Sequence, residues 1–358
     1  MKPIAPGART VPVGLALLAF LVWSAFAAWH AQTQAADFYV FWTAGAHATA
    51  PYDPAIIAAL QATYHIDGAV PFVYPPTFLL LAWPFAQLPL ALAYPLWTGL
   101  SAAAFFYAAA HVVRPNWATI GLFISPPVVL AIAPGQTSLL VGAAMIGGWL
   151  SLKRRPVLAG VLFALAACIK PQAMILAPIL LRGHWRAMRW SLIAGLGLVV
   201  ASFAFGPLIW LQWLRALADF SHVEPGTNRI NPSALLPSPW LAAVLAPLGV
   251  YIAVRSRDLA CLILGSLCLT PYAHQYDLAP LAPIAAAWLS QPNRFGWGRA
   301  GLGGAVLAGL IATPAAALAL LVAFEVLLSV LPPRDRRLAI RGREPAVDRL
   351  DQPLAAAP

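Results

Sequence analysis

The sequence contains very little charge. Asp, Glu, Lys and Arg together make up 9% of its 358 residues, whereas hydrophobic residues make up 61%. A soluble domain of this length cannot bury so much apolar surface, and the mean hydropathy of +0.76 agrees with that conclusion. A soluble protein is therefore excluded. The composition predicts an all-α polytopic membrane protein.

Cysteine and nucleotide-binding motifs are also scarce. Cys168, Cys261 and Cys268 all lie in apolar segments and show no disulfide or metal-ligand spacing. There is no Gly-rich loop of the kind that cradles nucleotide phosphates. The formal charge is +10, but the basic residues form short clusters between apolar runs. This is the pattern of the positive-inside rule, so we expect contact with membrane lipids and none with nucleic acid.

The first apolar segment, residues 11–30, follows Lys2 and Arg9 and predicts a retained signal-anchor running from the cytoplasm outward. Residues 31–73 then form a long loop with three aspartates and no Lys or Arg, which places it on the non-cytoplasmic face. Aromatic and aliphatic residues recur in this loop at near-helical spacing. We expect one or two short helices along the membrane surface.

About twelve crossings with both termini inside account for the remaining apolar segments. Residues 76–113 are interrupted at Gln87-Leu88-Pro89 and could cross once, after a short lead-in helix, or twice; the later basic clusters favour one crossing. A single membrane domain spans residues 1–333, and the charged tail, 334–358, is expected to be cytoplasmic and disordered. The further expected crossings are 117–134, 137–152, 156–169, 172–181, 188–205, 240–254, 259–270, 278–290, 300–311 and 315–331.

Polar residues from distant parts of the chain gather on the outer face in this topology. One polar residue at a helix end is usually an interfacial anchor, but convergence of many on one side indicates a site. Among the cations, Lys170, Arg215 and Arg229 are the exceptions to the cytoplasmic placement of Lys and Arg. The converging residues are Asp37, Tyr74, Gln136, Lys170, Arg229, Asn231, His274 and Asp277.

These residue types suit one reaction. A carboxylate at the membrane surface, here Asp37, can act as a general base toward a hydroxyl group. Lys170, Arg229 and His274 can bind a phosphate, because cations stabilise charge that develops on a leaving oxygen. Aromatic and apolar surroundings suit a lipid chain. Base, phosphate clamp and lipid-facing groove together indicate sugar transfer from a lipid-linked phosphosugar.

Six short motifs fall in the order seen in glycosyltransferase family 87, and the chain resembles this family from about residue 35 to residue 290. Within the C-class membrane glycosyltransferases, the resemblance is to the bacterial branch that uses polyprenol-phosphate mannose. The motifs are Asp37-Phe38, Tyr74-Pro75-Pro76, Gly135-Gln136, Lys170-Pro171, Asn231-Pro232-Ser233 and Pro271-Tyr272-Ala273-His274.

The resemblance implies an inverting transferase in the inner membrane of a bacterium, with its active site facing the periplasm or exterior. The donor would be a polyprenyl-phosphate sugar, such as mannose, and the acceptor a lipid or glycan. Asp37 matches the catalytic carboxylate, and His274 matches a histidine near the phosphate. Lys170, Gln136 and Tyr272 match polar positions that line the pocket. A single His274 and the rigid Pro232 depart from the pattern, which leaves the sugar and the acceptor open.

Two other classes remain as alternatives. A transporter or flippase would also place ionisable groups in a membrane cavity, although no internal repeat is found. An inactive relative would keep the fold without the chemistry.

Asp53, in Pro51-Tyr52-Asp53-Pro54, is interpreted as a turn former, and Asp277 as a partner of His274 or a helix-start residue. No paired acidic motif for a metal is present, so we expect no metal and leave the requirement open.

Overall fold

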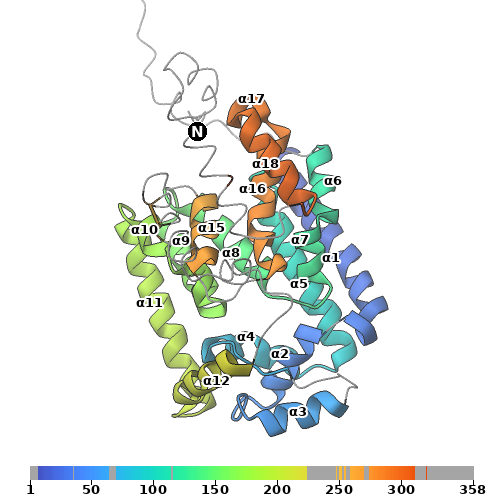
Figure 1. The fold of residues 1–358 in the computed structure, drawn as a ribbon, viewed down its shortest axis with the longest axis vertical. Coiled ribbons are helices and arrows are strands. Elements are labelled where there is room, and N and C mark those ends of the chain that lie inside the picture. Colours follow the sequence, from blue (N-terminus) through green and yellow to red (C-terminus); the bar gives the residue numbers. More distant parts are fainter. Residues whose placement is uncertain are drawn as a thin grey trace, which may run out of the picture.

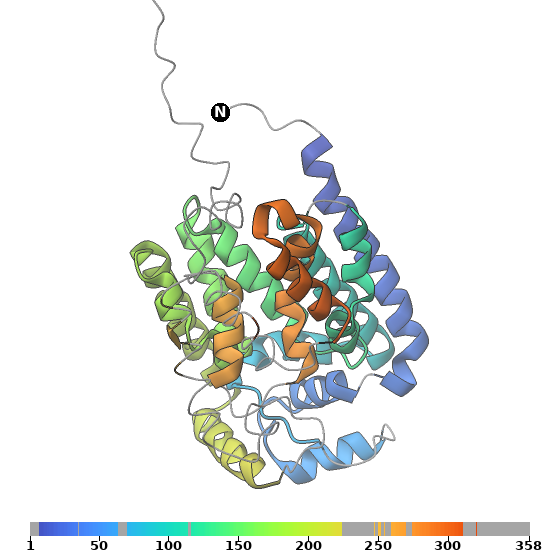
Figure 2. The same cartoon turned by 45° about the horizontal axis from the view of Figure 1, so that its top comes forward.

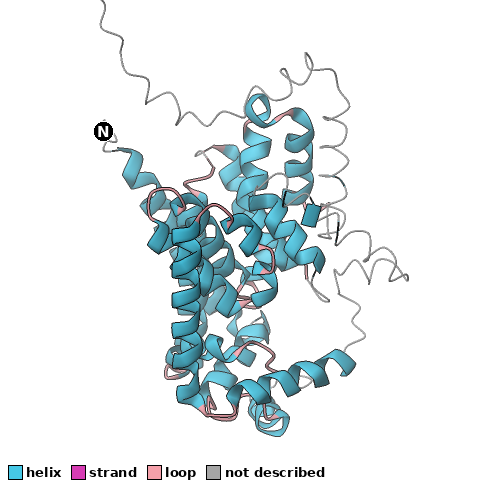
Figure 3. Ribbon diagram, turned by 90° about the vertical axis from the view of Figure 1, so that its left-hand side faces the viewer, coloured by secondary structure: helices cyan, strands magenta, loops and turns pink. Residues whose placement is uncertain are grey.

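The computed structural model describes residues 7–34, 36–63, 70–113, 116–223, 259–269 and 274–310, with isolated residues 247, 250, 251, 254 and 320. Every element in these ranges is a helix, as Figures 1 and 3 show. The expected crossings at 240–254 and 315–331 lie largely or wholly outside the described residues, as does the tail 334–358.

The order of the helices follows the apolar segments of the sequence closely. In chain order the elements are α1 (Gly7–Gln34), α2 (Ala36–Ala46), α3 (Pro54–Thr63), α4 (Pro76–Ala86), α5 (Leu90–Ala109), α6 (Trp117–Ile124), α7 (Pro126–Ile132), α8 (Ser138–Ser151), α9 (Pro156–Ile169), η1 (Pro171–Met174), α10 (Ala177–Leu181), α11 (Trp185–Ser202), η2 (Phe203–Phe205), α12 (Ile209–Val223), α15 (Leu259–Leu269), η3 (Gln275–Leu281), α16 (Ala282–Ser290), α17 (Pro292–Phe295) and α18 (Trp297–Leu307).

Three of the described helices are long and apolar enough to cross a membrane. They contain Val11–His30 of α1, Leu90–Ala109 of α5, and Trp185–Phe205 of α11 with η2. The first matches the predicted crossing residue for residue. The described chain is thus an all-helical protein with three clear candidate spans, and the full count of twelve crossings stays a prediction.

Proline divides the remaining apolar sequence into short helices. The interruption at residues 87–89 separates the short α4 from the longer α5, as one crossing with a lead-in helix requires. The segment expected to cross at 117–134 is divided into α6 and α7, which corrects the expectation of one continuous helix. Ser125 is extended there (φ −65°, ψ 135°) because Pro126 disfavours the α conformation in the residue before it. Pro126 then begins α7.

The segment between α1 and α4 contains two short helices, α2 and α3, where the sequence predicts one or two. α2 packs against α4. Asp53 directly precedes α3, and its Oδ1 accepts hydrogen bonds from the backbone N–H groups of Ala55 (2.9 Å) and Ile56 (3.2 Å). The structural interpretation of Asp53 is therefore confirmed. Figure 2 shows α3 and α12 together at the end of the molecule opposite the start of α1. Helices α3 and α12 thus lie at the same end of the helix bundle.

Candidate functional site

Asp37 lies in the first turn of α2, directly against the turn between α7 and α8. The backbone N–H of Phe38 donates a hydrogen bond to the carbonyl of Pro134 at 2.9 Å, which joins the two segments. Gly135 has φ +76°, and a Cβ atom there would lie 2.7 Å from Cβ of Phe38. Only glycine allows this conformation and this close approach together. The turn therefore presents Gln136 to the start of α2.

Gln136 connects Asp37 to Tyr74. Its side chain is 4% exposed and forms a hydrogen bond with the Asp37 carboxylate. Its Oε1 accepts a hydrogen bond from the Tyr74 hydroxyl at 3.0 Å. The backbone of the turn is fixed as well, because Trp97 Nε1 donates to the carbonyl of Gly135 at 2.8 Å. A carboxylate, an amide and a phenol are thus joined in one chain of hydrogen bonds.

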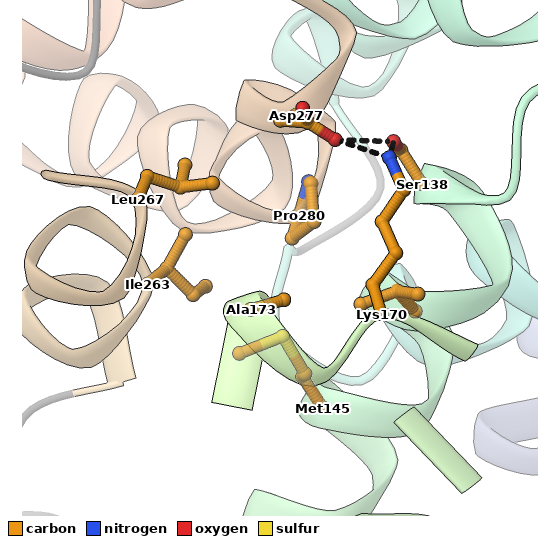
Figure 4. A pocket seen from close by; sticks show the side chains of 9 residues that line it. Ser138, Met145, Lys170, Ala173, Ile263, Leu267, Asp277 and Pro280 are labelled. Atoms are coloured by element: carbon orange, nitrogen blue, oxygen red, sulfur yellow. Dashed lines mark hydrogen bonds and ion pairs between the residues drawn. The ribbon is translucent and has the colours of Figure 1, made fainter. Parts of the chain in front are cut away.

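Lys170 forms a buried ion pair with Asp277. Its Nζ lies 2.6 Å from Asp277 Oδ1 and 3.3 Å from Ser138 Oγ, and the Ser138 hydroxyl itself donates to Asp277 Oδ1 at 3.0 Å. Figure 4 shows these three side chains meeting above an apolar pocket. The side chains of Lys170 and Asp277 are only 8% and 12% exposed. Pairing offsets much of the desolvation cost that either charge alone would carry.

The local sequence explains how these groups meet. Pro171 disfavours the α conformation at the residue before it, so α9 ends and Lys170 takes φ −134°, ψ 87°. Asp277 lies in the first turn of η3, where its Oδ2 accepts a hydrogen bond from the backbone N–H of His274 at 3.0 Å. Of the two readings predicted for Asp277, this bond is the one of a helix-start residue, because Asp277 caps η3 through the backbone of His274. The ion pair with Lys170 is an additional finding.

The electrostatic environment of Asp37 links the hydrogen bonds of Gln136 and Tyr74 to the ion pair of Lys170 and Asp277. Desolvation by burial raises the pKa of the Asp37 carboxyl above its ordinary value. The hydrogen bond from Gln136 and the charges of Lys170 and His274 lower that pKa, and Asp277 raises it. Desolvation is the largest effect, so Asp37 holds a proton more tightly than an exposed aspartate does.

The structure thus gathers most of the predicted site residues. Asp37, Tyr74, Gln136, Lys170, His274 and Asp277 all belong to this cluster. Arg229, Asn231 and Tyr272 lie outside the described residues. Sequence reasoning missed Thr137, Ser138 and Tyr276; the Tyr276 ring stacks on His274 at 4.8 Å and lies 5.0 Å from Lys170 Nζ. No short motif in the sequence identifies these three.

The pocket beneath the ion pair is lined by α8, η1, α15 and η3. Its other walls are apolar and include Met145, Ala173, Ile263, Leu267 and Pro280 (Figure 4). Within the described part of the chain, no group of three or more His, Cys, Asp or Glu residues could hold a metal ion. The pocket therefore has a charged rim, formed by Lys170 and Asp277, and an apolar wall.

Apolar helices long enough to span a membrane, together with a polar cluster at their ends, are features of a membrane protein with a site for a polar ligand. The model of glycosyltransferase family 87 matches residues 72–271, more than half of the chain, and the chain belongs to this family. It is therefore a glycosyltransferase, and the transporter alternative is not supported. Neither a curated protein nor a solved structure matched the chain. Tyr74, Gln136 and Lys170 lie inside the matched region, whereas Asp37, His274 and Asp277 lie outside it.

Proposed function

We propose that the protein transfers a sugar, mannose or a similar hexose, from a polyprenyl-phosphate donor to a lipid or glycan acceptor. The reaction takes place at the outer face of the membrane, inverts the anomeric configuration, and uses Asp37 as the general base. The single observation that carries this proposal is the environment of Asp37. A desolvated carboxylate with a raised pKa is hydrogen-bonded to Gln136 and lies within the field of Lys170 and His274, and Lys170 in turn lines a small pocket whose other walls are apolar.

The raised pKa of Asp37 suits a base. A carboxylate with the ordinary pKa is a weak proton acceptor at neutral pH, and burial makes it a stronger one. Phosphate is already a good leaving group. Deprotonation of the acceptor hydroxyl is therefore the step where the protein can help most, and a positioned base contributes about 10²–10⁴-fold.

Lys170 and His274 are the proposed contacts of the donor phosphate among the described residues. Lys170 donates to Ser138 and Asp277, and a third N–H of its ammonium group can still be directed to a phosphate oxygen. Asp277 holds the ammonium group in place. The ion pair therefore supports a positioning role for Asp277 and a binding role for Lys170. Arg229, Asn231 and Tyr272 complete the proposed site.

The proposed transfer is a single displacement. The Asp37 carboxylate takes the proton of the acceptor hydroxyl, and that oxygen forms a bond to the anomeric carbon of the sugar. The bond between the anomeric carbon and the phosphate oxygen breaks, and its electron pair stays on the phosphate. The products are the glycosylated acceptor, of opposite anomeric configuration, and polyprenyl phosphate.

The proposal is tested with purified protein, labelled polyprenyl-phosphate mannose and a panel of lipid and glycan acceptors. Wild type should transfer the label with release of polyprenyl phosphate, and Asp37→Asn should not. Asp53→Asn is the matched control: it lies in the same loop and caps α3, where Asn serves as well as Asp. Transfer from a nucleotide sugar, with none from any polyprenyl-phosphate sugar, would overturn the proposed donor.

Donor binding is tested separately from chemistry. Lys170→Met combined with Asp277→Asn removes both charges of the ion pair, so that no unpaired charge stays buried. This double variant should bind the donor at least about tenfold more weakly than wild type, because it loses a charge-assisted contact. The control is Arg215→Gln, a substitution at an exposed cation of α12. Equal donor affinity in the double variant and wild type would contradict the role of Lys170.

A further inference from the structure

The Gln136 amide is held at both of its ends. Its Oε1 faces two donors, the Tyr74 hydroxyl at 3.0 Å and the backbone N–H of Thr137 at 3.3 Å. A backbone N–H can only donate, so the amide atom that faces it is the oxygen. An ionised carboxylate can only accept, so the atom that faces Asp37 is Nε2. Both partners select the same orientation of the amide.

Tyr74 is itself fixed and stays a donor. Its ring packs against Phe41 at 4.9 Å and Phe78 at 4.7 Å between ring centroids, and its carbonyl accepts a hydrogen bond from the Tyr52 hydroxyl at 2.7 Å. Burial raises the pKa of the Tyr74 phenol well above its ordinary value, so the hydroxyl keeps its proton at any pH used in an assay. It can therefore donate to Gln136 throughout the working range.

We infer that Tyr74 is a positioning residue for Asp37: its hydroxyl locks the Gln136 amide, and that amide holds the carboxylate in the orientation that receives the acceptor proton. The inference rests on the proposed role of Asp37 as general base. Without the hydroxyl, Oε1 keeps only the longer bond from the Thr137 backbone. The amide then gains freedom to rotate, and Asp37 loses its fixed donor for part of the time.

The charged neighbours of Asp37 are common to all the variants that test this idea. Lys170 and His274 favour its ionised form and Asp277 opposes it, and none of them is changed in Tyr74→Phe. The hydrogen bond from Gln136 also favours the ionised form. Loosening that bond therefore raises the pKa of the base. The acidic limb of the pH–rate profile of kcat should move to higher pH.

The experiment measures kcat against pH for labelled sugar transfer. On the acidic limb, Tyr74→Phe should turn over up to about tenfold more slowly than wild type, since the bond from Gln136 to the charged carboxylate is weakened, and it should recover toward the wild-type plateau at alkaline pH. Tyr52→Phe is the matched control, because it removes a partly buried phenol bond to the Tyr74 carbonyl and leaves the Tyr74 side chain with its hydroxyl bond to Gln136 and its ring contacts with Phe41 and Phe78. A purely structural role for Tyr74 predicts the same profile for both variants.

The double-mutant cycle tests whether Tyr74 acts through Gln136. Gln136→Met removes the donor to Asp37 and should move the acidic limb in the same direction as Tyr74→Phe. Adding Tyr74→Phe to Gln136→Met should then change the profile little. Additive shifts would overturn the inference. If Tyr74→Phe does not fold, 4-methylphenylalanine in place of Tyr74 fills the space of the hydroxyl without a donor, and 4-aminophenylalanine should restore the wild-type profile.

The outcomes separate this inference from the proposed function. If Asp37→Asn is inactive and the profile of Tyr74→Phe is unshifted, the positioning role is wrong and the base assignment stands. If folded Asp37→Asn keeps wild-type turnover, the base assignment fails and the inference fails with it. A shift of the acidic limb in Tyr74→Phe supports both the positioning role of Tyr74 and the base assignment of Asp37 under two conditions. Tyr52→Phe must show no such shift, and Tyr74→Phe must add none in the Gln136→Met background.

Discussion

Burial of Asp37 has opposite effects on stability and on the proposed catalysis. Its folded-state pKa is raised, so the folded protein binds this proton more tightly than the unfolded chain does. The contribution of Asp37 to the free energy of unfolding therefore falls as pH rises from its ordinary pKa, 3.8, through the raised folded value. At neutral pH the ionised, desolvated carboxylate is a cost to stability.

Asp37→Asn should accordingly lose turnover without losing stability. Turnover should fall by about 10²–10⁴-fold, the usual contribution of a positioned base. The melting temperature at neutral pH should stay unchanged or rise, because the buried charge is gone. A role of Asp37 in capping α2 predicts the reverse, a lower melting temperature with normal activity per folded molecule. Measuring both quantities on one preparation distinguishes the two.

The ion pair of Lys170 and Asp277 predicts strongly non-additive stability effects. Lys170→Met leaves the Asp277 carboxylate buried without its cation, a change that typically costs about 3–5 kcal/mol. Adding Asp277→Asn removes that charge and should recover most of the loss. Melting temperatures of the two single variants and the double variant measure the coupling. Equal destabilisation by Lys170→Met alone and by the double variant would show that the pair is not a stabilising unit.

Individual residues of the site could be predicted from the sequence, but their pairing could not. Asp37, Lys170 and His274 were identified because charges are costly at the ends of apolar segments. The sequence offers Asp277 only local roles, as a partner of His274 three residues earlier or as a helix-start residue. The ion-pair partner that the structure gives it, Lys170, lies 107 residues away along the chain. Such a contact depends on tertiary packing and leaves no local pattern.

The boundaries of the helices followed the sequence where proline and charge marked them. Residues 156–169 were predicted as one segment and form α9 with the same limits, because Pro156 begins the helix and Pro171 follows its end. The division of residues 117–134 at Ser125 was not predicted. A double proline inside an apolar run can kink a helix or end it, and the choice depends on the neighbours it packs against.

Helices α16 and α18 pack closely enough to require a glycine. A Cβ atom on Gly303 of α18 would clash with the carbonyl oxygen of Ala285 unless the backbone moved. Gly303→Ala should lower the melting temperature, with a cost of about 1–3 kcal/mol for the overpacking. Gly301→Ala in the same helix is the control, because nothing lies within 4 Å of its Cβ position.

Gly301→Ala should be neutral or slightly stabilising, since alanine favours helix more than glycine by roughly 0.5–1 kcal/mol. Because α16 follows η3 directly, Gly303→Ala should also weaken sugar transfer through displacement of Asp277. Identical melting temperatures for the two variants would contradict the close packing of α16 on α18.

The arrangement of the whole molecule places its basic turns away from the site. α8 begins at Ser138 and α9 ends beside Lys170, so the turn between them, with Lys153, Arg154 and Arg155, lies at the far ends of both helices. Each helix is 14 residues, or about 20 Å, long. Figure 1 shows α11 running from beside α10 to α12 at the lower end of the molecule. This separation supports opposite sides of a membrane for the site and the basic clusters.

The last prediction follows from that separation: the site faces the exterior, and Lys153 and Arg186 face the cytoplasm. The test labels single cysteines from outside intact cells, in a background where Cys168, Cys261 and Cys268 are replaced by alanine. Thr49→Cys reports on the loop that contains Asp37, and Lys153→Cys and Arg186→Cys report on the basic clusters; all three positions are exposed in the structure. A membrane-impermeant maleimide should label position 49 in intact cells, and positions 153 and 186 only after the cells are opened. The positive-inside rule predicts this result, because short loops rich in Lys and Arg are mostly retained in the cytoplasm. Labelling at 153 in intact cells, with none at 49, would invert the topology and exclude a reaction at the outer face.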